Sequence, residues 1–100
     1  MAAEKKPFRE KVFTVVSKIP KGKTATYAQV AKAAGSPNAA RAVGNVLARN
    51  PHPIIIPCHR VVRSDGTVGG YLGKKGSKKK RALLEAEGAS FKNNRTKADW

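Results

Sequence analysis

The stretch TYAQVAKAAGSPNAARAVGNVLARNP, residues 26–51, carries two short helical patterns separated by Gly-Ser-Pro. At its start, Thr26 is followed three residues later by Gln29, a spacing typical of a capping box. The first helix should therefore run over residues 27–34. Gly35 is expected to close it, because glycine readily adopts the left-handed backbone conformation that ends many helices.

The second helical pattern begins directly after this glycine. Ser36 is a favourable N-cap and Pro37 a favourable first helical residue, so we expect the second helix to start there. It should end near Asn50, because Pro51 disfavours helix in the residue before it. Two short helices joined by so tight a turn predict a helix-turn-helix.

The second helix carries an unusual number of small residues around one cation. Ala39, Ala40, Ala42 and Gly44 are small, and Arg41 stands among them. Small side chains let a backbone approach a binding partner closely, but they suit the packing of one helix against another equally well. The pattern alone leaves both interpretations open, and the positive charge of the chain favours contact with DNA.

Two further helices are predicted on either side of this pair. Apolar residues recur at helical spacing over residues 7–18, which indicates an amphipathic helix. A last helix is expected over residues 78–87, with Leu83 and Leu84 facing inward and Gly88 as its stop. Most of the regular structure should therefore be α-helical.

The rest of the chain predicts little β structure. Residues 54–56, three isoleucines between prolines, suit a short buried segment, and residues 63–73 suggest a strand, a turn and a glycine-rich loop. We expect a mostly α, winged-helix or helix-turn-helix-like fold with a short β segment, in one compact domain over residues 1–100. Residues 1–6 and 89–100 lack periodicity and are expected to be loose basic tails.

Charge is the strongest global signal. The chain has 21 Lys and Arg against 6 Asp and Glu, a net charge of +15. Such an excess favours a polyanionic partner, most simply nucleic acid, although some basic proteins owe their charge to other causes. No apolar run approaches the roughly 20 residues of a membrane helix. With one cysteine and no signal-peptide pattern, we expect a cytoplasmic or nucleoid-associated protein that does not bind membranes.

A cluster of cations, Lys78 to Arg81, stands at the start of the last predicted helix. This is the unfavourable end for positive charge, because the helix dipole is positive at its N-terminus. A bound phosphate would offset the repulsion. A solvated lysine cluster, screened by salt, is an equally good interpretation.

The single cysteine, Cys58, follows the apolar run in IIIPCHRVV, residues 54–62. A thiol reacts as its thiolate, and apolar surroundings disfavour that form, so a nucleophilic Cys58 needs a base. His59 is adjacent, but on an extended segment neighbouring side chains point to opposite faces. A water bridge between them is then more plausible than direct contact. Otherwise Cys58 would be a buried structural cysteine.

An acidic partner for His59 would have to come from six carboxylates in the whole chain. Glu87 is the best placed, because it lies inward near the end of the last predicted helix. Cysteine, histidine and glutamate would then form a relay of the kind that activates nucleophiles.

Several motifs together resemble one known family, the O6-alkylguanine-DNA alkyltransferases. NPHPIIIPCHRVV resembles the active-site stretch of the family, whose hallmark is PCHRV. The helix pair with its preceding GKTA is similar to the family's helix-turn-helix, DGTVGGYLG to its active-site loop, and LLEAEG to its closing helix. The resemblance spans roughly residues 7–90 and indicates the C-terminal DNA-binding and catalytic domain of that family.

The resemblance implies a catalytic role for four residues. Cys58 would accept the alkyl group, and His59 would act as the water-mediated base that deprotonates it, oriented by Glu87. Tyr27 would press on the phosphate 3′ to the target nucleotide and supply a proton to the departing guanine oxygen.

The resemblance also implies how DNA is bound. Arg41 would enter the duplex from the minor groove and fill the space of the flipped-out base. Ala39, Ala40 and Gly44 would allow the helix to approach the groove closely. Arg49 departs from the family, which often has a small residue there, and it would add a phosphate contact.

A further set of residues would shape the guanine pocket. Asn50 would also stiffen the turn that joins the DNA-binding helix to the active site. Leu72 stands where the family often has serine, so it would keep a backbone amide for the guanine oxygen and lose a hydroxyl. The full set is Asn50, Pro53, Val61, Tyr71, Leu72 and Gly73.

The function expected from the resemblance is irreversible repair of O6-alkylguanine in double-stranded DNA, one alkyl group per molecule. No cofactor or metal is expected, and the protein should act as a monomer. One alternative is an alkyltransferase-like sensor, which binds the lesion without repairing it and usually has tryptophan in place of the cysteine. A basic architectural protein with a structural cysteine is a second alternative, although it gives no reason for Pro-Cys-His-Arg.

Overall fold

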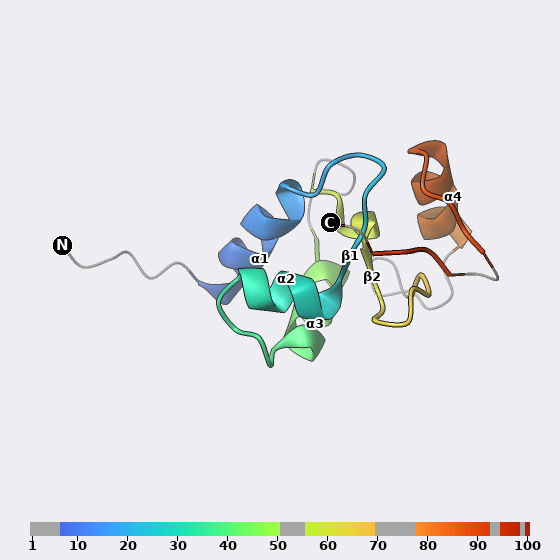
Figure 1. The fold of residues 1–100 in the computed structure, drawn as a ribbon. Coiled ribbons are helices and arrows are strands. Elements are labelled where there is room, and N and C mark those ends of the chain that lie inside the picture. Colours follow the sequence, from blue (N-terminus) through green and yellow to red (C-terminus); the bar gives the residue numbers. More distant parts are fainter. Residues whose placement is uncertain (1–6, 51–55, 70–77, 93–94, 99) are drawn as a thin grey trace.

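The computed structural model describes residues 7–50, 56–69, 78–92, 95–98 and 100. Figure 1 shows α1, α2 and α3 grouped at one end of the molecule and α4 at the other, with the two short strands between them. This arrangement confirms the predicted mostly α fold with a short β segment. The elements, in chain order, are α1 (Phe8–Ser17), β1 (Ala25–Thr26), α2 (Tyr27–Ala33), α3 (Ala40–Ala48), the 3₁₀ turn η1 (Cys58–Arg60), β2 (Val61–Val62) and α4 (Lys78–Ala86).

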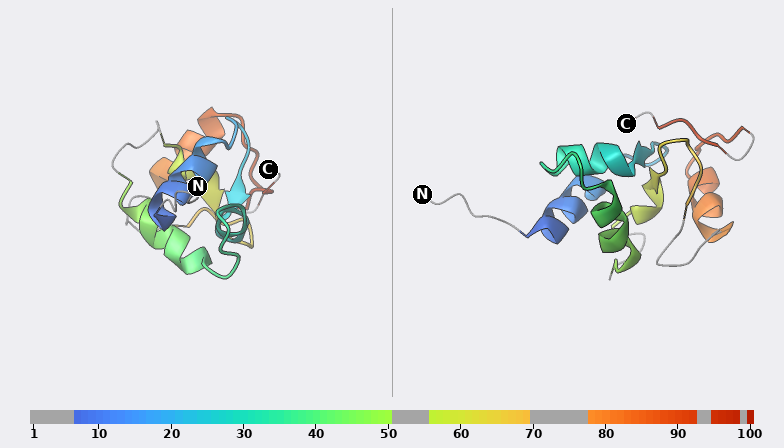
Figure 2. Two further views of the ribbon diagram at one scale, coloured as in Figure 1. Left: turned by 90° about the vertical axis from the view of Figure 1, so that its left-hand side faces the viewer. Right: turned by 90° about the horizontal axis from the view of Figure 1, so that it is seen from below.

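The first helix, α1, confirms the amphipathic pattern. Val12, Val15 and Val16 are buried on one face, while charged and small polar residues are exposed on the other. The helix ends at Lys18, whose N–H donates to the carbonyl of Val15 at 3.0 Å. Figure 2 shows the same helix against α2 and α3 from two other directions.

The capping box at the start of α2 is present as predicted. The Gln29 N–H donates to Oγ1 of Thr26 at 3.0 Å, and the Thr26 N–H donates to Oε1 of Gln29 at 2.7 Å. Such a cap stabilises a helix by about 1 kcal/mol. Gly35 ends the helix with φ of +86°.

The start of α3 differs from the prediction, which placed it at Ser36 and Pro37. The N–H of Ser36 instead donates to Ala31 O at 2.9 Å, which completes the closing motif of α2. Residues 36–39 then form a turn, with the Ala39 N–H bonded to Ser36 O at 3.0 Å. Because Ser36 belongs to the end of α2, α3 begins four residues later. Its end near Asn50 agrees with the prediction.

The core lies where α1, α2 and α3 meet. Val43 and Leu47 of α3 are buried against residues of the two preceding helices and against Val61. Replacing Leu47, which is 4% exposed, by alanine should cost about 2–5 kcal/mol of unfolding free energy. This core fixes α3 relative to the segment that carries Cys58.

The two strands pair in parallel, with Ala25 opposite Val61 and Thr26 opposite Val62. Tyr27 and Arg63 therefore follow the same end of the strand pair. Upstream of β2, the backbone at Cys58 is not extended, contrary to the geometry assumed from sequence. It forms a 3₁₀ turn, closed by the Arg60 N–H bonded to Pro57 O at 2.9 Å.

A tight turn follows β2, as the Ser-Asp-Gly sequence predicted. The Gly66 N–H donates to Arg63 O at 2.8 Å, and the Arg63 N–H donates to Thr67 O at 3.0 Å. Gly66 has φ of +85°, a conformation that other residues rarely adopt. Gly66, at the tip of this turn, lies next to Thr96 near the C-terminus.

The described residues after α4 are not a loose tail, contrary to the prediction. We call residues 89–92, 95–98 and 100 the C-terminal strap. The Thr96 N–H donates to Gly66 O at 2.9 Å, and the Trp100 N–H donates to Thr24 O at 3.1 Å. Thr24 Oγ1 also donates to Lys97 O at 2.9 Å. These bonds join backbone segments far apart in sequence, so no local pattern signals them.

The last helix, α4, agrees with the prediction of a helix over residues 78–87. Leu84 is fully buried and Leu83 is partly buried, and Gly88 follows the helix with φ of +95°. Lys80 is also buried, at 1% exposure, so it does not belong to a solvated lysine cluster. Among the described residues, every helix is too short or too polar to cross a membrane.

Candidate active site

Cys58 opens the 3₁₀ turn and is 3% exposed. Burial raises the pKa of its thiol, whereas a hydrogen bond from the Asn50 side chain, the positive charge of Lys80 and a backbone hydrogen bond oppose that rise. At neutral pH the sulfur therefore rests as a thiol. The groups that would stabilise a thiolate are already in place around it.

Asn50 connects the end of α3 to the cysteine. It is 6% exposed, and its Nδ2 donates to the carbonyl of Ile56 at 2.8 Å. Its side chain also lies close enough to Cys58 to lower the pKa of the thiol as a hydrogen-bond donor. One amide thus holds the backbone two residues before the cysteine and the thiol itself.

His59 is fully buried beside a carboxylate. Its Nε2 lies 3.0 Å from Oε1 of Glu87, close enough for an ion pair although not aligned as a hydrogen bond of good geometry. Burial lowers the pKa of His59, and Glu87 opposes that effect. The imidazole is therefore neutral at neutral pH, and its Nδ1 makes no hydrogen bond to any described residue.

Arg60 holds the carboxylate of Glu87 in place. Nε of Arg60 donates to Oε1 at 2.9 Å and Nη2 donates to Oε2 at 2.7 Å, while Nη1 donates to the carbonyl of Ile19 at 2.8 Å. The pKa of Glu87 is lowered, chiefly by the bonds from Arg60 and then by His59. Glu87 is therefore ionised, and Arg60 ties its carboxylate to the segment that follows α1.

Tyr27 and Lys80 form a second pair near the cysteine. Nζ of Lys80 donates to the Tyr27 hydroxyl at 3.3 Å and lies 5.5 Å from the centre of the ring. Burial lowers the pKa of Lys80 to about 8, although a charge on Cys58 opposes this. The pKa of Tyr27 is raised, first by burial and then by the charge of Cys58. Tyr27 therefore remains a phenol that can donate its proton.

Gly69 lies against the Tyr27 hydroxyl. A Cβ at this position would lie 3.6 Å from that oxygen and 3.3 Å from Nε of Arg63, and φ is +74°. A side chain here would crowd Arg63 and the tyrosine hydroxyl. The exposed Arg63 also adds positive charge near Tyr27 and Lys80.

Three of these residues were missed by sequence reasoning. Lys80 was grouped with its exposed neighbours, although its spacing to Leu84 and Glu87 places it on the buried face of α4. Arg60 stands inside the PCHRV motif and could have been considered as the partner of Glu87. Nothing in the sequence indicated Arg63.

The two arginines predicted to contact DNA are exposed near the two ends of α3. Arg41 is the second residue of the helix and Arg49 directly follows its last residue. Both guanidinium groups can therefore reach a partner that lies along α3. Neither belongs to the buried face of the helix, which Val43 and Leu47 form.

The small residues of α3 serve helix packing as well as any approach to a partner. Ala39 packs against the core, and Ala40 and Gly44 are half-buried. A Cβ at Gly44 would lie 3.9 Å from the Tyr27 ring, an ordinary packing distance. The packing interpretation therefore has structural support, and close approach to a partner stays a prediction.

Residues 7–89 match a family model described as "6-O-methylguanine DNA methyltransferase, DNA binding domain". The chain belongs to this family. Methylated-DNA–protein-cysteine methyltransferase of Methanothermobacter thermautotrophicus is 53% identical over 85 residues, covering 84% of this chain and 46% of that protein. The constitutive enzyme of Bacillus subtilis is 44% identical, covering 86% and 52%. The chain thus spans about half the length of these relatives.

Solved structures agree with the family assignment. Mycobacterium tuberculosis OGT in complex with DNA superimposes with a TM-score of 0.75 at 42% identity, covering 84% of this chain and 51% of that chain. S. pombe Atl1, in complex with damaged DNA containing O6-carboxymethylguanine, has a TM-score of 0.75 at 33% identity, covering 92% and 88%. The family model describes a DNA-binding domain. The expectation that this domain is C-terminal in the longer relatives stays a prediction.

Two of the residues expected to shape a guanine pocket lie in the described part of the chain, and their role in such a pocket stays a prediction. Asn50 lies beside Cys58, and Val61 is fully buried in the core directly after the 3₁₀ turn. The described part of the chain contains no cluster of three or more His, Cys, Asp or Glu side chains that could bind a metal ion. The other expected pocket residues lie outside the described residues: Pro53, Tyr71, Leu72 and Gly73.

Proposed function

We propose that this chain repairs DNA by moving an alkyl group from O6 of guanine in a duplex to Sγ of Cys58, once per molecule. The observation that carries the proposal is the buried thiol, which has Asn50 and Lys80 beside it and the His59–Glu87 pair adjacent in the fold. A buried cysteine with a base and a stabilising cation has the features of an activated nucleophile. The names of the relatives support the same reaction.

In the first step His59 removes the thiol proton. The lowered pKa of His59 keeps the imidazole neutral and able to accept a proton, and Nδ1 has no other partner among the described residues. The transfer passes directly or through one water. Glu87 carries a full negative charge and stabilises the imidazolium that forms. This division of roles resembles that of a nucleophile, a base and an orienting acid.

In the second step the thiolate attacks the alkyl carbon. A sulfur–carbon bond forms, the carbon–oxygen bond breaks, and the electron pair moves onto the guanine. Tyr27 gives its proton to the guanine, and Lys80 replaces that proton through the 3.3 Å contact. At the end the sulfur carries the alkyl group, His59 holds the thiol proton and Lys80 is neutral. Because a thioether does not release its alkyl group, the protein acts once.

The target base has to leave the stack to reach a thiol that is 3% exposed. Arg41, exposed at the start of α3, would enter the minor groove and fill the space left by the base. Arg49 and Tyr27 would contact phosphates on either side of that position. The net charge of +15 supports a monomer that binds duplex DNA with little dependence on sequence. A nucleoid-associated location would follow from such a substrate.

The alternative of a lesion sensor that does not repair predicts a site without a nucleophile. Atl1 shares the fold of this chain over most of its length, so the fold does not discriminate between the two functions. Cys58 does discriminate, because its thiol is surrounded by groups that stabilise a thiolate.

The proposal is tested on the DNA product. A duplex with one O6-methylguanine is incubated with excess protein and digested to nucleosides. We expect O6-methylguanine to be replaced by an equal amount of guanine, and Cys58→Ser to bind the duplex without changing it. A lesion that stays intact in the presence of wild-type protein would refute the proposal. So would repair by Cys58→Ser at the wild-type rate.

A further inference from the structure

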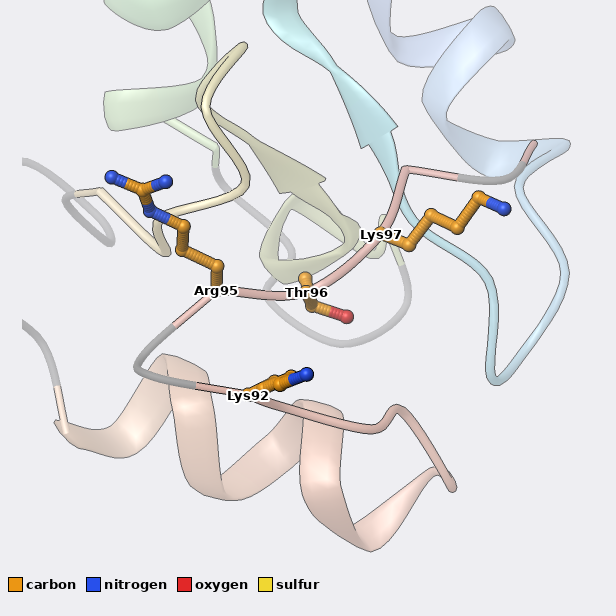
Figure 3. Close-up of a pocket in the computed structure, with 4 residues that line it drawn as sticks. All are labelled: Lys92, Arg95, Thr96 and Lys97. Atoms are coloured by element: carbon orange, nitrogen blue, oxygen red, sulfur yellow. The ribbon is translucent and has the colours of Figure 1, made fainter.

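A basic hollow lies beyond the residues that match the family model. Lys92, Arg95, Thr96 and Lys97 line a volume of about 620 Å³. Figure 3 shows that all four side chains come from the C-terminal strap. All four residues follow residue 89, where the match to the family model ends. Nothing in the proposed alkyl transfer uses them.

The strap holds its cations in fixed positions relative to the active site. Thr96 and Trp100 bond through their backbone to the turn at Gly66 and to Thr24, one residue before β1. Gly66 permits this contact, because a Cβ there would lie 2.5 Å from Thr96 O. Since β1 leads directly into Tyr27, the strap is joined to the same strand that positions the tyrosine. Side chains of the strap are not needed for these backbone bonds.

Positive charge predominates in the C-terminal strap. Residues 89–98 contain three cations and no carboxylate, and Asp99 is the one acidic residue after them. Asp65 lies close enough to Arg95 and Arg63 to be affected by both charges. Its carboxylate already accepts hydrogen bonds from the N–H and the hydroxyl of Thr67, at 3.0 and 2.7 Å. The carboxylate of Asp65, which is already hydrogen-bonded to Thr67, therefore lies near several cations.

The arrangement of the cations indicates the kind of anion that fits. In Figure 3, Lys92 lies over α4, while Arg95 and Lys97 extend from the strap in opposite directions. The three charges are thus spread along the strap and do not converge on one point. A compact ion could meet one or two of them, whereas a chain of phosphates could meet all three.

We infer that Lys92, Arg95 and Lys97 form a second contact surface for the DNA backbone, separate from α3. This inference rests on the proposed function, because it concerns the same duplex. Phosphate contacts orient a protein on DNA without reading sequence. Because the strap is bonded to Gly66 and Thr24, a phosphate contact there would help to set the angle at which Tyr27 and Cys58 meet the duplex.

The test is the salt dependence of binding to a duplex of about 20 base pairs, measured by fluorescence anisotropy between about 50 and 200 mM salt. The variant replaces Lys92, Arg95 and Lys97 by alanine. Each lost phosphate contact should lower the slope of log K against log salt by about 0.9, so we expect a decrease of about 2–3. A second variant, with Lys11, Lys18 and Lys21 replaced by alanine, removes the same charge from α1 and the turn after it. We expect a clearly smaller decrease there.

Two further measurements separate the possible failures. Alkyl transfer from free O6-benzylguanine should be equal in the wild type and the strap variant, since no strap side chain contacts Cys58 in the proposed reaction. If wild-type protein neither binds duplex DNA nor accepts an alkyl group, the proposed function fails. If it does both and the two triple variants lose the same slope, the strap inference alone is overturned.

A single-anion site is the remaining alternative. It predicts that inorganic phosphate raises the melting temperature of the wild type but not of the strap variant, at constant ionic strength, with an unchanged slope for DNA. That result would also overturn the inference. We expect similar melting temperatures for both proteins without DNA, because the strap is held through its backbone.

Discussion

Nζ of Lys80 lies 3.3 Å from the hydroxyl oxygen of Tyr27, and the lysine is 1% exposed. Keeping an ammonium group buried is costly, and here it lowers the pKa of Lys80 to about 8. The same contact supplies a proton donor behind the tyrosine and a positive charge near Cys58. The stability cost and the proposed catalytic benefit therefore reside in one side chain.

The first prediction concerns the rate of alkyl transfer. Lys80→Met should slow transfer from a lesion-containing duplex by about 10²-fold or more, the usual contribution of a positioned proton donor. The wild-type rate should fall as pH rises through about 8, because Lys80 then loses its proton. That decline should be absent from the variant. The exposed neighbour Lys79 provides the matched control, since Lys79→Met should react like the wild type. Wild-type kinetics in Lys80→Met would exclude this role.

The second prediction concerns stability. The substitution of Lys80 that slows alkyl transfer should make the folded protein more stable. At neutral pH Lys80 is protonated in both the folded and the unfolded state. A pKa of about 8 in place of 10.5 then corresponds to a cost of roughly 3 kcal/mol in the folded state. Between these two values only the unfolded state keeps the proton, so the cost disappears as pH rises. Lys80→Met should therefore be more stable at pH 7 by about 1–3 kcal/mol, since it also loses the bond to Tyr27.

Urea denaturation at pH 7 and at pH 10 checks this second prediction. The difference in unfolding free energy between Lys80→Met and the wild type should be smaller at pH 10 than at pH 7. A variant that is less stable than the wild type at pH 7 would show that the buried ammonium is compensated within the fold.

The third prediction concerns the carboxylate between His59 and Arg60. Glu87→Gln keeps the shape of the side chain and removes its charge. Transfer should fall by about 10²-fold, because the imidazolium loses its partner. Because the folded-state pKa of Glu87 is lowered, its contribution to stability is complete above the unfolded-state value and is lost as pH falls through the folded one. The variant should therefore lose less stability than the wild type between pH 7 and pH 3.

Glu85→Gln is the control for this third prediction. Glu85 has a side chain that is 53% exposed and a long, 3.6 Å contact with Arg81, so its loss should change little. If both glutamine variants behave alike in the transfer assay, Glu87 has no special role in it.

The fourth prediction concerns base extrusion. Arg41→Ala should slow repair of O6-methylguanine in a duplex by at least about tenfold, because extrusion costs a few kcal/mol that a filling side chain offsets. Transfer from free O6-benzylguanine should be unchanged, since no base has to leave a stack. Arg49→Ala should instead weaken binding and lower the salt slope by about 0.9. Equal losses on duplex and free base would contradict the role of Arg41.

Local patterns predicted the helices well, because their signals lie within a few residues. The capping box of Thr26 and Gln29 is an example, since both hydrogen bonds join residues three apart. The start of α3 was placed wrongly because Ser36 suits a helix start by type, while its amide is used to close α2. One residue could not satisfy both signals, and composition alone did not show which would prevail.

The candidate site was predictable where a motif or a helical face carried it. Glu87 was expected beside His59, and the two lie 3.0 Å apart. Lys80 was missed because lysine is usually exposed, so its position on the buried face of α4 was discounted. The C-terminal strap could not be foreseen, since Thr96 and Trp100 are held by backbone bonds to distant residues. Because backbone groups make these bonds, the pattern of side chains in the sequence does not indicate them.

The most direct test of the central claim is the intact mass of the protein after mixing with an excess of duplex that contains O6-methylguanine. We expect a gain of one methyl group per molecule, located on the peptide that carries Cys58, with no second addition at longer times. An unchanged mass, together with tight and lesion-selective binding, would contradict it and identify the protein as a sensor of damage.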